Sequence, residues 1–207
     1  MISKFFKLEQ EKRERILNAA TKEFGEKGFG NASTNEIVME AGISKGLLFH
    51  YFTNKKGLYL FLYDYYVELM VDELFTKLDL EDGDILSKWR RIGWLKFELM
   101  KRHPEMFDFL KSVYEETDSE VKSELEKRNY DVIETSYAKI LSNIDTSLFK
   151  PNIDIGRAIN IIIWTLEGYG NQQKILTKNT PMDLLNIEKL IEGMDEYIEM
   201  LKSMFYK

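Results

Sequence analysis

Apolar residues recur along this chain with the 3.6-residue period of an α-helix, in segments separated by short polar or glycine-containing breaks. The sequence has only 3 prolines and is rich in Leu, Ile, Lys and Glu, which favours helices over a strand-rich fold. We therefore expect an all-α protein. The pattern predicts about nine helices, near residues 9–27, 34–41, 45–51, 55–75, 85–101, 104–112, 120–141, 153–168 and 182–204.

Two of these helical patterns meet at Gly42, in the stretch from Thr34 to Lys55. A glycine at this point accepts the left-handed conformation that ends a helix, and Ser44 is a suitable N-cap for the helix that follows. The spacing therefore predicts a tight helix-turn-helix. Its two helices can share one small core of apolar side chains: Ile37, Val38, Ala41, Ile43, Leu48 and Phe52.

The second helix of this pair, about Lys45 to Tyr51, has an unusual outer face. If Leu48 points inward, the 100° step per residue turns five other side-chain positions outward or to the flanks: Lys45, Gly46, Leu47, Phe49 and His50. Lysine, glycine, aromatic rings and imidazole together suit nucleic acid better than water.

The same stretch resembles the DNA-binding signature of the TetR family of transcriptional regulators. The resemblance covers about the first quarter of the chain and implies a DNA-binding domain of three helices at residues 1–54. A helical domain for ligand binding and dimerisation would follow at residues 55–207. The resemblance rests on Thr34, Ile37, Ala41-Gly42-Ile43-Ser44-Lys45-Gly46, Leu48, His50-Tyr51-Phe52, Asn54-Lys55 and Leu58.

Each outward residue of the second helix has a possible task on DNA. Lys45 can neutralise a phosphate or donate to guanine, Gly46 permits close approach of the backbone, and Leu47 or Phe49 can meet thymine methyl groups. By resemblance, His50 and Tyr51 are phosphate donors. The alternative is that Leu47, Phe49 and Tyr51 are core residues of a small helical domain. The full set of expected DNA-binding residues is Thr34, Ser44, Lys45, Gly46, Leu47, Phe49, His50, Tyr51 and Lys55.

Helix N-termini supply the remaining expected phosphate contacts. Thr34 and the pair Asn54-Lys55 begin helices, where free N–H groups and the helix dipole favour an anion. Ser33 and Glu36 have the spacing of a capping box. The alternative role of Thr34 and Asn54 is therefore helix capping alone.

The net charge of −6 is unevenly distributed along the chain. Residues 1–57 contain ten Lys or Arg and seven Asp or Glu, a net charge of +3, whereas residues 58–207 contain nineteen and twenty-eight, a net charge of −9. DNA contact is therefore expected at the N-terminal part only. The first residues have too short an apolar run for a signal peptide, and no run is long enough for a membrane span. With no cysteine present, these features predict a soluble, cytoplasmic protein without thiolate metal sites.

The sequence does not favour an enzyme. The only histidines, His50 and His103, do not pair with a recognisable nucleophile or a second metal ligand, and His103-Pro104 is better interpreted as a helix boundary. We expect no catalytic residue, no metal site and no cofactor.

The C-terminal domain is expected to bind a small molecule. The helix at residues 55–75 is apolar on two sides and would connect the two domains. An aromatic pocket with one carboxylate would favour a lipophilic ligand, in particular a lipophilic cation. The alternative is that the same residues serve only in core and dimer packing. The expected ligand-binding residues are Tyr66, Met70, Trp94, Phe97, Phe107, Tyr114, Trp164 and Glu167.

The last two predicted helices, the eighth and ninth, carry more apolar surface than one domain face can cover, which predicts a homodimer that pairs them as a four-helix bundle. We interpret the chain as a transcriptional regulator, a repressor as the first choice. It would bind a palindromic operator and be released by a small-molecule inducer. The alternative is a helical carrier or interaction protein of the same fold that has lost operator binding, an option that Leu47 and Phe49 keep open.

Overall fold

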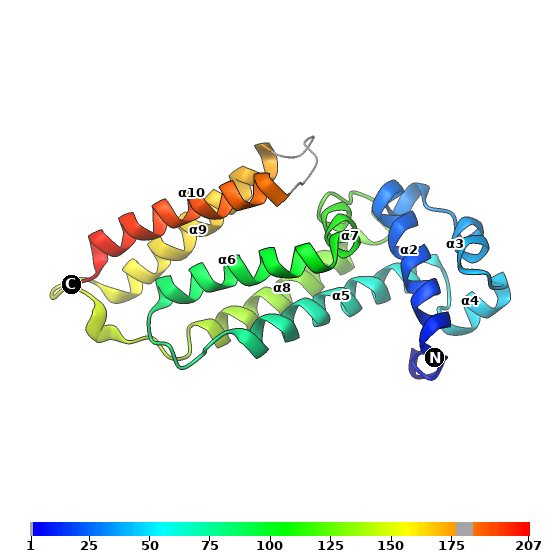
Figure 1. Ribbon diagram of the computed structural model, residues 1–207, viewed down its shortest axis with the longest axis horizontal. Coiled ribbons are helices and arrows are strands. Elements are labelled where there is room, and N and C mark those ends of the chain that lie inside the picture. Colours follow the sequence, from blue (N-terminus) through cyan, green and yellow to red (C-terminus); the bar gives the residue numbers. More distant parts are fainter. Residues whose placement is uncertain (1, 177–183) are drawn as a thin grey trace. The chain divides into compact units, whose positions relative to one another are not determined.

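The computed structural model (Figure 1) describes residues 2–176 and 184–207, and these residues form ten α-helices and one short 3-10 helix. The predicted all-α fold is confirmed. The elements are α1 (Ile2–Phe5), α2 (Gln10–Asn31), α3 (Thr34–Ala41), α4 (Lys45–Tyr51), α5 (Lys55–Lys77), α6 (Ile85–Arg102), α7 (Pro104–Tyr114), α8 (Lys122–Ile140), η1 (Thr146–Leu148), α9 (Ile155–Leu176) and α10 (Leu184–Phe205).

Several helix boundaries lie where local chemistry requires them. Gly28 interrupts α2 with φ 67°, and Gly42 ends α3 with φ 65°, a conformation that glycine adopts without steric cost. Ser44 caps α4 by accepting a hydrogen bond from the Leu47 N–H at 3.2 Å. Pro104 begins α7 directly after α6 ends, as expected for a residue whose fixed φ suits the first helical position.

Other expectations about the helices were wrong. The short helix α1 and the 3-10 helix η1 were not predicted, because each has too few residues to show a period. Helix α9 continues to Leu176 instead of ending near Gly168. Gly168 and Gly170 lack a positive φ, and a glycine in helical conformation lowers helix stability by about 1 kcal/mol without ending the helix. The start of the ninth predicted helix, residues 182 and 183, lies outside the described residues.

The chain divides into two compact units, each built from two segments. The first unit contains Met1–Val71 and Arg102–Glu134, and the second contains Asp72–Lys101 and Thr135–Lys207. Helix α7 and the first part of α8 therefore belong to the same unit as the helix-turn-helix, and α7 packs against α2. The boundary expected at residues 54 and 55 concerns DNA and ligand binding and stays a prediction.

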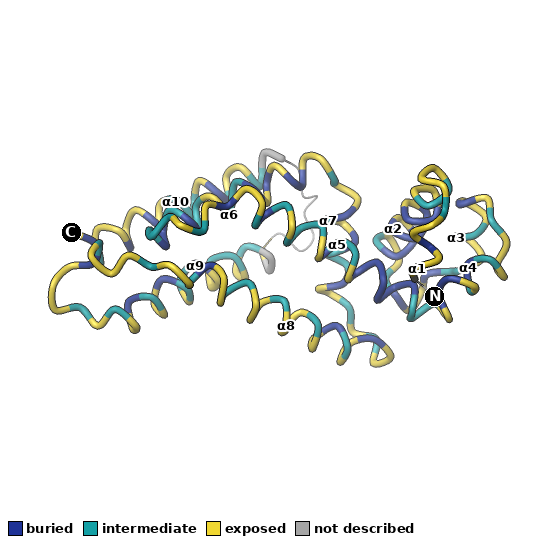
Figure 2. The backbone as a smooth tube through the Cα atoms, turned by 90° about the horizontal axis from the view of Figure 1, so that it is seen from below, coloured by how far each residue is buried: buried dark blue, intermediate teal, exposed yellow. Residues whose placement is uncertain are grey.

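Phe5 anchors α1 in the core of the first unit. Its side chain is 0% exposed, and its ring lies 5.8 Å from that of Tyr51, 5.0 Å from Phe52 and 5.4 Å from Phe61. The α5 part of this core is visible in Figure 2 as a run of dark blue positions. The neighbouring Phe6 is 46% exposed. Burial of Phe5 thus joins the start of the chain to the C-terminal end of α4.

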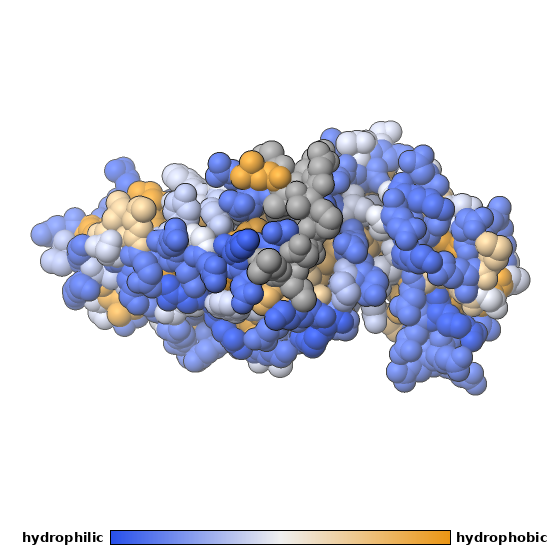
Figure 3. All heavy atoms as spheres, turned by 45° about the horizontal axis from the view of Figure 1, so that its top comes forward, coloured by the Kyte–Doolittle hydropathy of each residue, from blue (hydrophilic) through white to orange (hydrophobic). Residues whose placement is uncertain are grey.

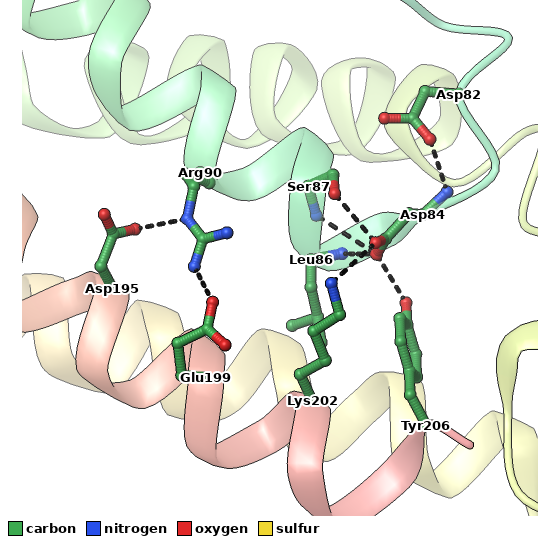
Figure 4. Close-up of polar contacts among 9 residues, drawn as sticks. All are labelled: Asp82, Asp84, Leu86, Ser87, Arg90, Asp195, Glu199, Lys202 and Tyr206. Carbon is green, nitrogen blue, oxygen red and sulfur yellow. Dashed lines mark hydrogen bonds and ion pairs between the residues drawn. The ribbon is translucent and has the colours of Figure 1, made fainter.

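Polar contacts fix α6 to α10 in the second unit (Figure 4). Asp84 caps α6 by accepting from the N–H groups of Leu86 and Ser87, and it also accepts from the Tyr206 hydroxyl at 2.8 Å. Burial alone would raise the pKa of Asp84, but the hydrogen bonds from Ser87 and Tyr206 outweigh it and lower the pKa. One turn further along α6, Arg90 contacts Asp195 at 2.8 Å and Glu199 at 2.5 Å, both on α10.

Lys88 is a buried cation of the second unit, with 1% of its surface exposed. Its ammonium donates to the carbonyl oxygens of Ile140 at 3.2 Å and Asn143 at 3.3 Å, at the C-terminal end of α8. A cation at this end is favourable because the last carbonyls of a helix carry partial negative charge. No helix in the described part of the chain is long and apolar enough to cross a membrane.

Replacing Phe5 by alanine should destabilise the first unit by about 3–5 kcal/mol, the range for truncating a buried aromatic side chain. Phe6→Ala is the matched control, since its ring is half exposed and should contribute much less. Urea unfolding curves of the two variants measure the difference. Equal losses of stability would show that α1 is not part of the core.

Candidate nucleic-acid interface

Helices α3 and α4 are joined by a turn of three residues that starts at Gly42. The Gly42 N–H donates to the Met39 carbonyl at 3.3 Å, and the Ile43 N–H donates to the Val38 carbonyl at 3.0 Å. These bonds use carbonyl groups that the end of α3 would otherwise leave free. The turn therefore holds α3 and α4 in a fixed helix-turn-helix.

Leu48 directs the inner face of α4 toward the core. Leu48, like Ile37 and Ala41 of α3, is 0% exposed. Leu47 is half-buried and packs against the same core, so only part of its side chain is available to DNA. Its expected contact with a thymine methyl group stays a prediction.

The first turn of α4 is the most accessible part of the helix. Ser44, Lys45 and Gly46 are all exposed, and a Cβ atom added at Gly46 would meet no atom within 4 Å. Phe49 is half-buried, with the Lys45 ammonium 6.0 Å from its ring centroid. Backbone and lysine together form the part of α4 that a duplex could approach closely.

The end of α4 combines an exposed imidazole with a buried ring. His50 is exposed, whereas Tyr51 is only 8% exposed and its ring packs on Phe5. The two rings of His50 and Tyr51 contact each other edge to face, with centroids 5.3 Å apart. The Tyr51 ring is thus a core residue, and its expected hydroxyl contact with phosphate stays a prediction.

Lys55 has a structural role that the sequence did not reveal. Its ammonium donates to the carbonyl oxygens of Gly30 at 3.1 Å and Ala32 at 3.0 Å, and lies 4.7 Å from the ring of Phe29. Two of its three donors are thus used at the end of α2. A phosphate contact by Lys55 would use the third. The preceding residue Asn54 caps α5, as expected, by accepting from the Gly57 N–H at 2.8 Å.

The start of α3 is held differently from the capping box predicted for it. Ser33 is the N-cap residue, but its side chain makes no capping hydrogen bond. Instead its N–H donates to the buried carboxylate of Glu23 at 2.8 Å, and Lys27 pairs with the same carboxylate at 2.9 Å. Thr34, the first helical residue, is half-buried. The phosphate site predicted at this terminus therefore lies next to the carboxylate of Glu23.

Burial alone would raise the pKa of Glu23, but hydrogen bonds from Lys27 and from the Ser33 N–H outweigh this and lower the pKa below 4.5. The ionised carboxylate is therefore the form that stabilises the junction of α2 and α3.

Lys45 has a partner that sequence analysis missed. Its ammonium donates to the side-chain carbonyl of Asn35, the second residue of α3, at 2.9 Å. The two residues are ten positions apart on different helices, so no helical spacing signals their contact. Asn35 joins the residues at the outer surface of the helix-turn-helix.

The expected ligand-binding residues of the first unit are only partly enclosed. Tyr66 is half-buried, and its hydroxyl forms a hydrogen bond of 2.7 Å with Thr21 in α2. Burial raises the pKa of Tyr66 and the Thr21 hydrogen bond lowers it, with a net rise. Met70 and Phe107 are also half-buried, whereas Tyr114 is 64% exposed.

In the second unit, Trp94 and Phe97 lie together on α6, with ring centroids 5.8 Å apart. Phe97 is buried, but Trp164 on α9 is 67% exposed. Glu167, also exposed on α9, accepts a hydrogen bond from the Tyr137 hydroxyl of α8. An outward Trp164 suits a contact surface better than a pocket, and the ligand-binding role of the whole set stays a prediction.

Comparison with known proteins identifies the family. The family model described as "Bacterial regulatory proteins, tetR family" matches residues 16–61, which contain α3 and α4. The HTH-type transcriptional regulator YfiR of Bacillus subtilis is 30% identical over 159 residues, which cover 73% of this chain and 75% of YfiR. The chain belongs to the tetR family of bacterial regulatory proteins. It is a transcriptional regulator with a DNA-binding helix-turn-helix.

Other relatives of this TetR-family chain share less of their length. The regulator YerO of Bacillus subtilis is 36% identical over 64 residues, and the match spans only 22% of YerO. Solved structures resemble this chain over most of its length, but at these low sequence identities the likeness concerns the fold alone. FadR from Bacillus halodurans, described as a fatty acid degradation regulator, has a TM-score of 0.66 at 16% identity, covering 91% of this chain and 97% of its own. A transcriptional regulator from Rhodococcus sp. Rha1 has a TM-score of 0.68 at 19% identity, covering 93% and 96%.

The lowered pKa of Glu23 predicts an acid-sensitive junction between α2 and α3 in the first unit. Its contribution to the free energy of unfolding is complete above pH 4.5 and is lost as the pH falls through the lower, folded-state pKa. Glu23→Gln should therefore be less stable at neutral pH and lose less stability between about pH 7 and pH 3 than the unmodified protein.

Urea unfolding at a series of pH values measures this effect. Glu26→Gln, an exposed position on the same helix, is the control and should keep the acid profile of the unmodified protein. An unchanged acid profile in Glu23→Gln would refute the assigned role of the carboxylate.

Proposed function

We propose that this regulator is a repressor that binds a palindromic operator as a homodimer and is released by a small lipophilic inducer. The observation that carries the proposal is the first turn of α4, where Lys45 and Gly46 are exposed beside open space. This turn contains no acidic residue, so it presents only positive charge and backbone to a partner. Those features suit the major groove of DNA.

Phosphate contacts would surround this base-reading turn. The first N–H groups of α3 and α5, at Thr34 and Lys55, would supply some of these contacts, and His50 is exposed at the end of α4. Such contacts position the protein on the duplex without reading sequence. They also make affinity depend steeply on salt, because each neutralised phosphate releases counterions.

A homodimer is supported by the outer faces of α9 and α10, which lie side by side. These faces carry exposed apolar or aromatic side chains, and Figure 3 shows hydrophobic atoms in orange at the surface of this part of the protein. Paired with their copies, α9 and α10 would form a four-helix bundle around a two-fold axis. The side chains are Ile161, Trp164, Leu176, Tyr197, Met200 and Met204.

Induction requires that a ligand shift the helix-turn-helix, and α5 has the contacts to do so within the first unit. Its Tyr66 hydroxyl bonds to Thr21 in the middle of α2, and its Lys55 ammonium holds the carbonyl groups at the end of α2. A ligand that displaces α5 near Tyr66 would therefore move α2, against which α3 packs.

Gly46→Ala separates DNA binding from folding. The added Cβ meets no atom of the protein, and alanine raises helix stability by about 1 kcal/mol, so the fold should gain stability. If the first turn lies against base edges, the same methyl group should lower operator affinity about 5- to 150-fold, the effect of a steric misfit. Fluorescence anisotropy with operator DNA at several salt concentrations measures the affinity.

Gly25→Ala is the matched control, because it is a helical glycine of α2, outside the proposed dimer interface, where an added Cβ meets no atom closer than 3.5 Å. It should leave operator affinity unchanged. Full operator affinity in Gly46→Ala would mean that the first turn of α4 does not approach the bases.

Trp164→Ala should weaken the dimer, because the variant loses a large apolar side chain that we place in the interface. Tyr130→Ala on α8 is a suitable comparison, since Tyr130 is 65% exposed and Trp164 67%. Analytical ultracentrifugation over a dilution series measures the dissociation constants. A monomer at micromolar concentration in the unmodified protein, or equal effects of the two substitutions, would count against this interface.

An inducer and the operator must oppose each other by the same factor, since coupling between two sites is reciprocal. A coupling of about 1–3 kcal/mol would weaken each binding event about 5- to 150-fold. Calorimetric titration of lipophilic cations and acyl compounds into free and operator-bound protein measures this factor. Tyr66→Phe, which removes the bond to Thr21, should reduce it. A ligand that binds both forms equally is not an inducer, and failure of every bound ligand would favour the carrier function.

A further inference from the structure

The side chains of Asn35 and Lys45 form a polar pair on the surface of the helix-turn-helix. The Lys45 ammonium donates to the Asn35 carbonyl oxygen at 2.9 Å, and both residues are exposed. Asn35 belongs to the first turn of α3, and Lys45 is the first residue of α4. The pair therefore connects the N-terminal ends of two helices that are separate in sequence.

Stability does not explain this pair. A lysine at a helix N-terminus lies next to the positive end of the helix dipole, which is unfavourable, and α4 has no acidic residue in its first turn to offset it. A hydrogen bond between two exposed side chains also contributes little, because water replaces it at almost no cost. What the bond does is orient an otherwise flexible lysine side chain beside Gly46.

The hydrogen bond also changes what Asn35 can recognise. An asparagine reads adenine by using its carbonyl oxygen and its amide N–H together, because the adenine edge offers one acceptor and one donor. Here the carbonyl faces the Lys45 ammonium, whose charge repels the amino group of adenine. Because one lone pair of that oxygen is used and the nearby charge disfavours a donor at the other, the pair offers mainly hydrogen-bond donors. Guanine, which presents two acceptors in the major groove, is the base that matches them.

We propose that Asn35 is a specificity-determining residue, which orients Lys45 so that the two side chains read one guanine in each operator half-site. The inference rests on the proposed function, because it requires that α4 enters the major groove. It adds a residue of α3 to the base-reading surface and gives the recognised base. It also predicts that the two residues act as one unit.

Operator variants with each base pair of a half-site replaced in turn test this proposal. The unmodified protein should prefer guanine over other bases at one position by about 5- to 150-fold. Asn35→Ala should lose most of that preference at this position alone. Lys45→Ala frees the Asn35 carbonyl, so the preferred base there should change from guanine to adenine.

The double variant should lose no more discrimination at this position than the worse single variant, since residues that act together are not additive. Asn129→Ala, an exposed asparagine on α8 of the same unit, is the matched control and should keep the full base preference. Thermal unfolding confirms that each variant is folded.

Three results would overturn the proposal: an equal effect of Asn35→Ala on all operator variants, a retained guanine preference in Lys45→Ala, or additive effects in the double variant. A protein that binds no operator at any salt concentration would instead contradict the proposed function itself.

Discussion

The recognition helix α4 has only seven residues, and a helix of that length is not stable alone in water. Its shape and direction therefore depend on the burial of Leu48 and Tyr51 in the core of the first unit. Phe5, near the start of the chain, packs on Tyr51 in this core, and the left-handed Gly42 fixes how α4 leaves α3. Because the inner side of α4 is held so firmly, its outer side can carry residues that contribute nothing to folding.

Polar groups place the other helices of the first unit relative to α2. Lys55 holds the last carbonyls of α2 and Glu23 holds the first N–H before α3, so the N-termini of α5 and α3 are both tied to one helix. Glu116, between α7 and α8, accepts from the Phe29 N–H at 2.7 Å near the same point. The end of α2 is thus the place where α3 and α5 meet the segment between α7 and α8, which belongs to the same compact unit.

Much of this fold could be predicted from residues that act on their immediate neighbours in sequence. Contacts between residues far apart in sequence could not be predicted. Gly42, Ser44 and Pro104 act within a few residues, so the helix-turn-helix and most helix boundaries could be read from the sequence. The Ser33 N–H lies ten positions from Glu23, and the carbonyl partners of Lys55 lie more than twenty positions away. A capping box was therefore predicted at Ser33, and the structural contacts of Lys55 were missed. Whether a candidate site residue can reach DNA depends on the exposure of its side chain, which the sequence pattern does not give. The helical period does not distinguish the half-buried Leu47 from the exposed Gly46.

We propose that a dimer of this chain reads DNA with the first turn of α4. The most direct test of this proposal is to incubate the purified protein with fragments of its own genome, recover the retained DNA and sequence it. We expect enrichment of one inverted repeat whose half-sites lie about 34 Å apart, one helical turn, or a multiple of that distance. Binding should weaken steeply as the salt concentration rises. Recovery of fragments without a common repeat, or of no DNA at all, would contradict the proposal.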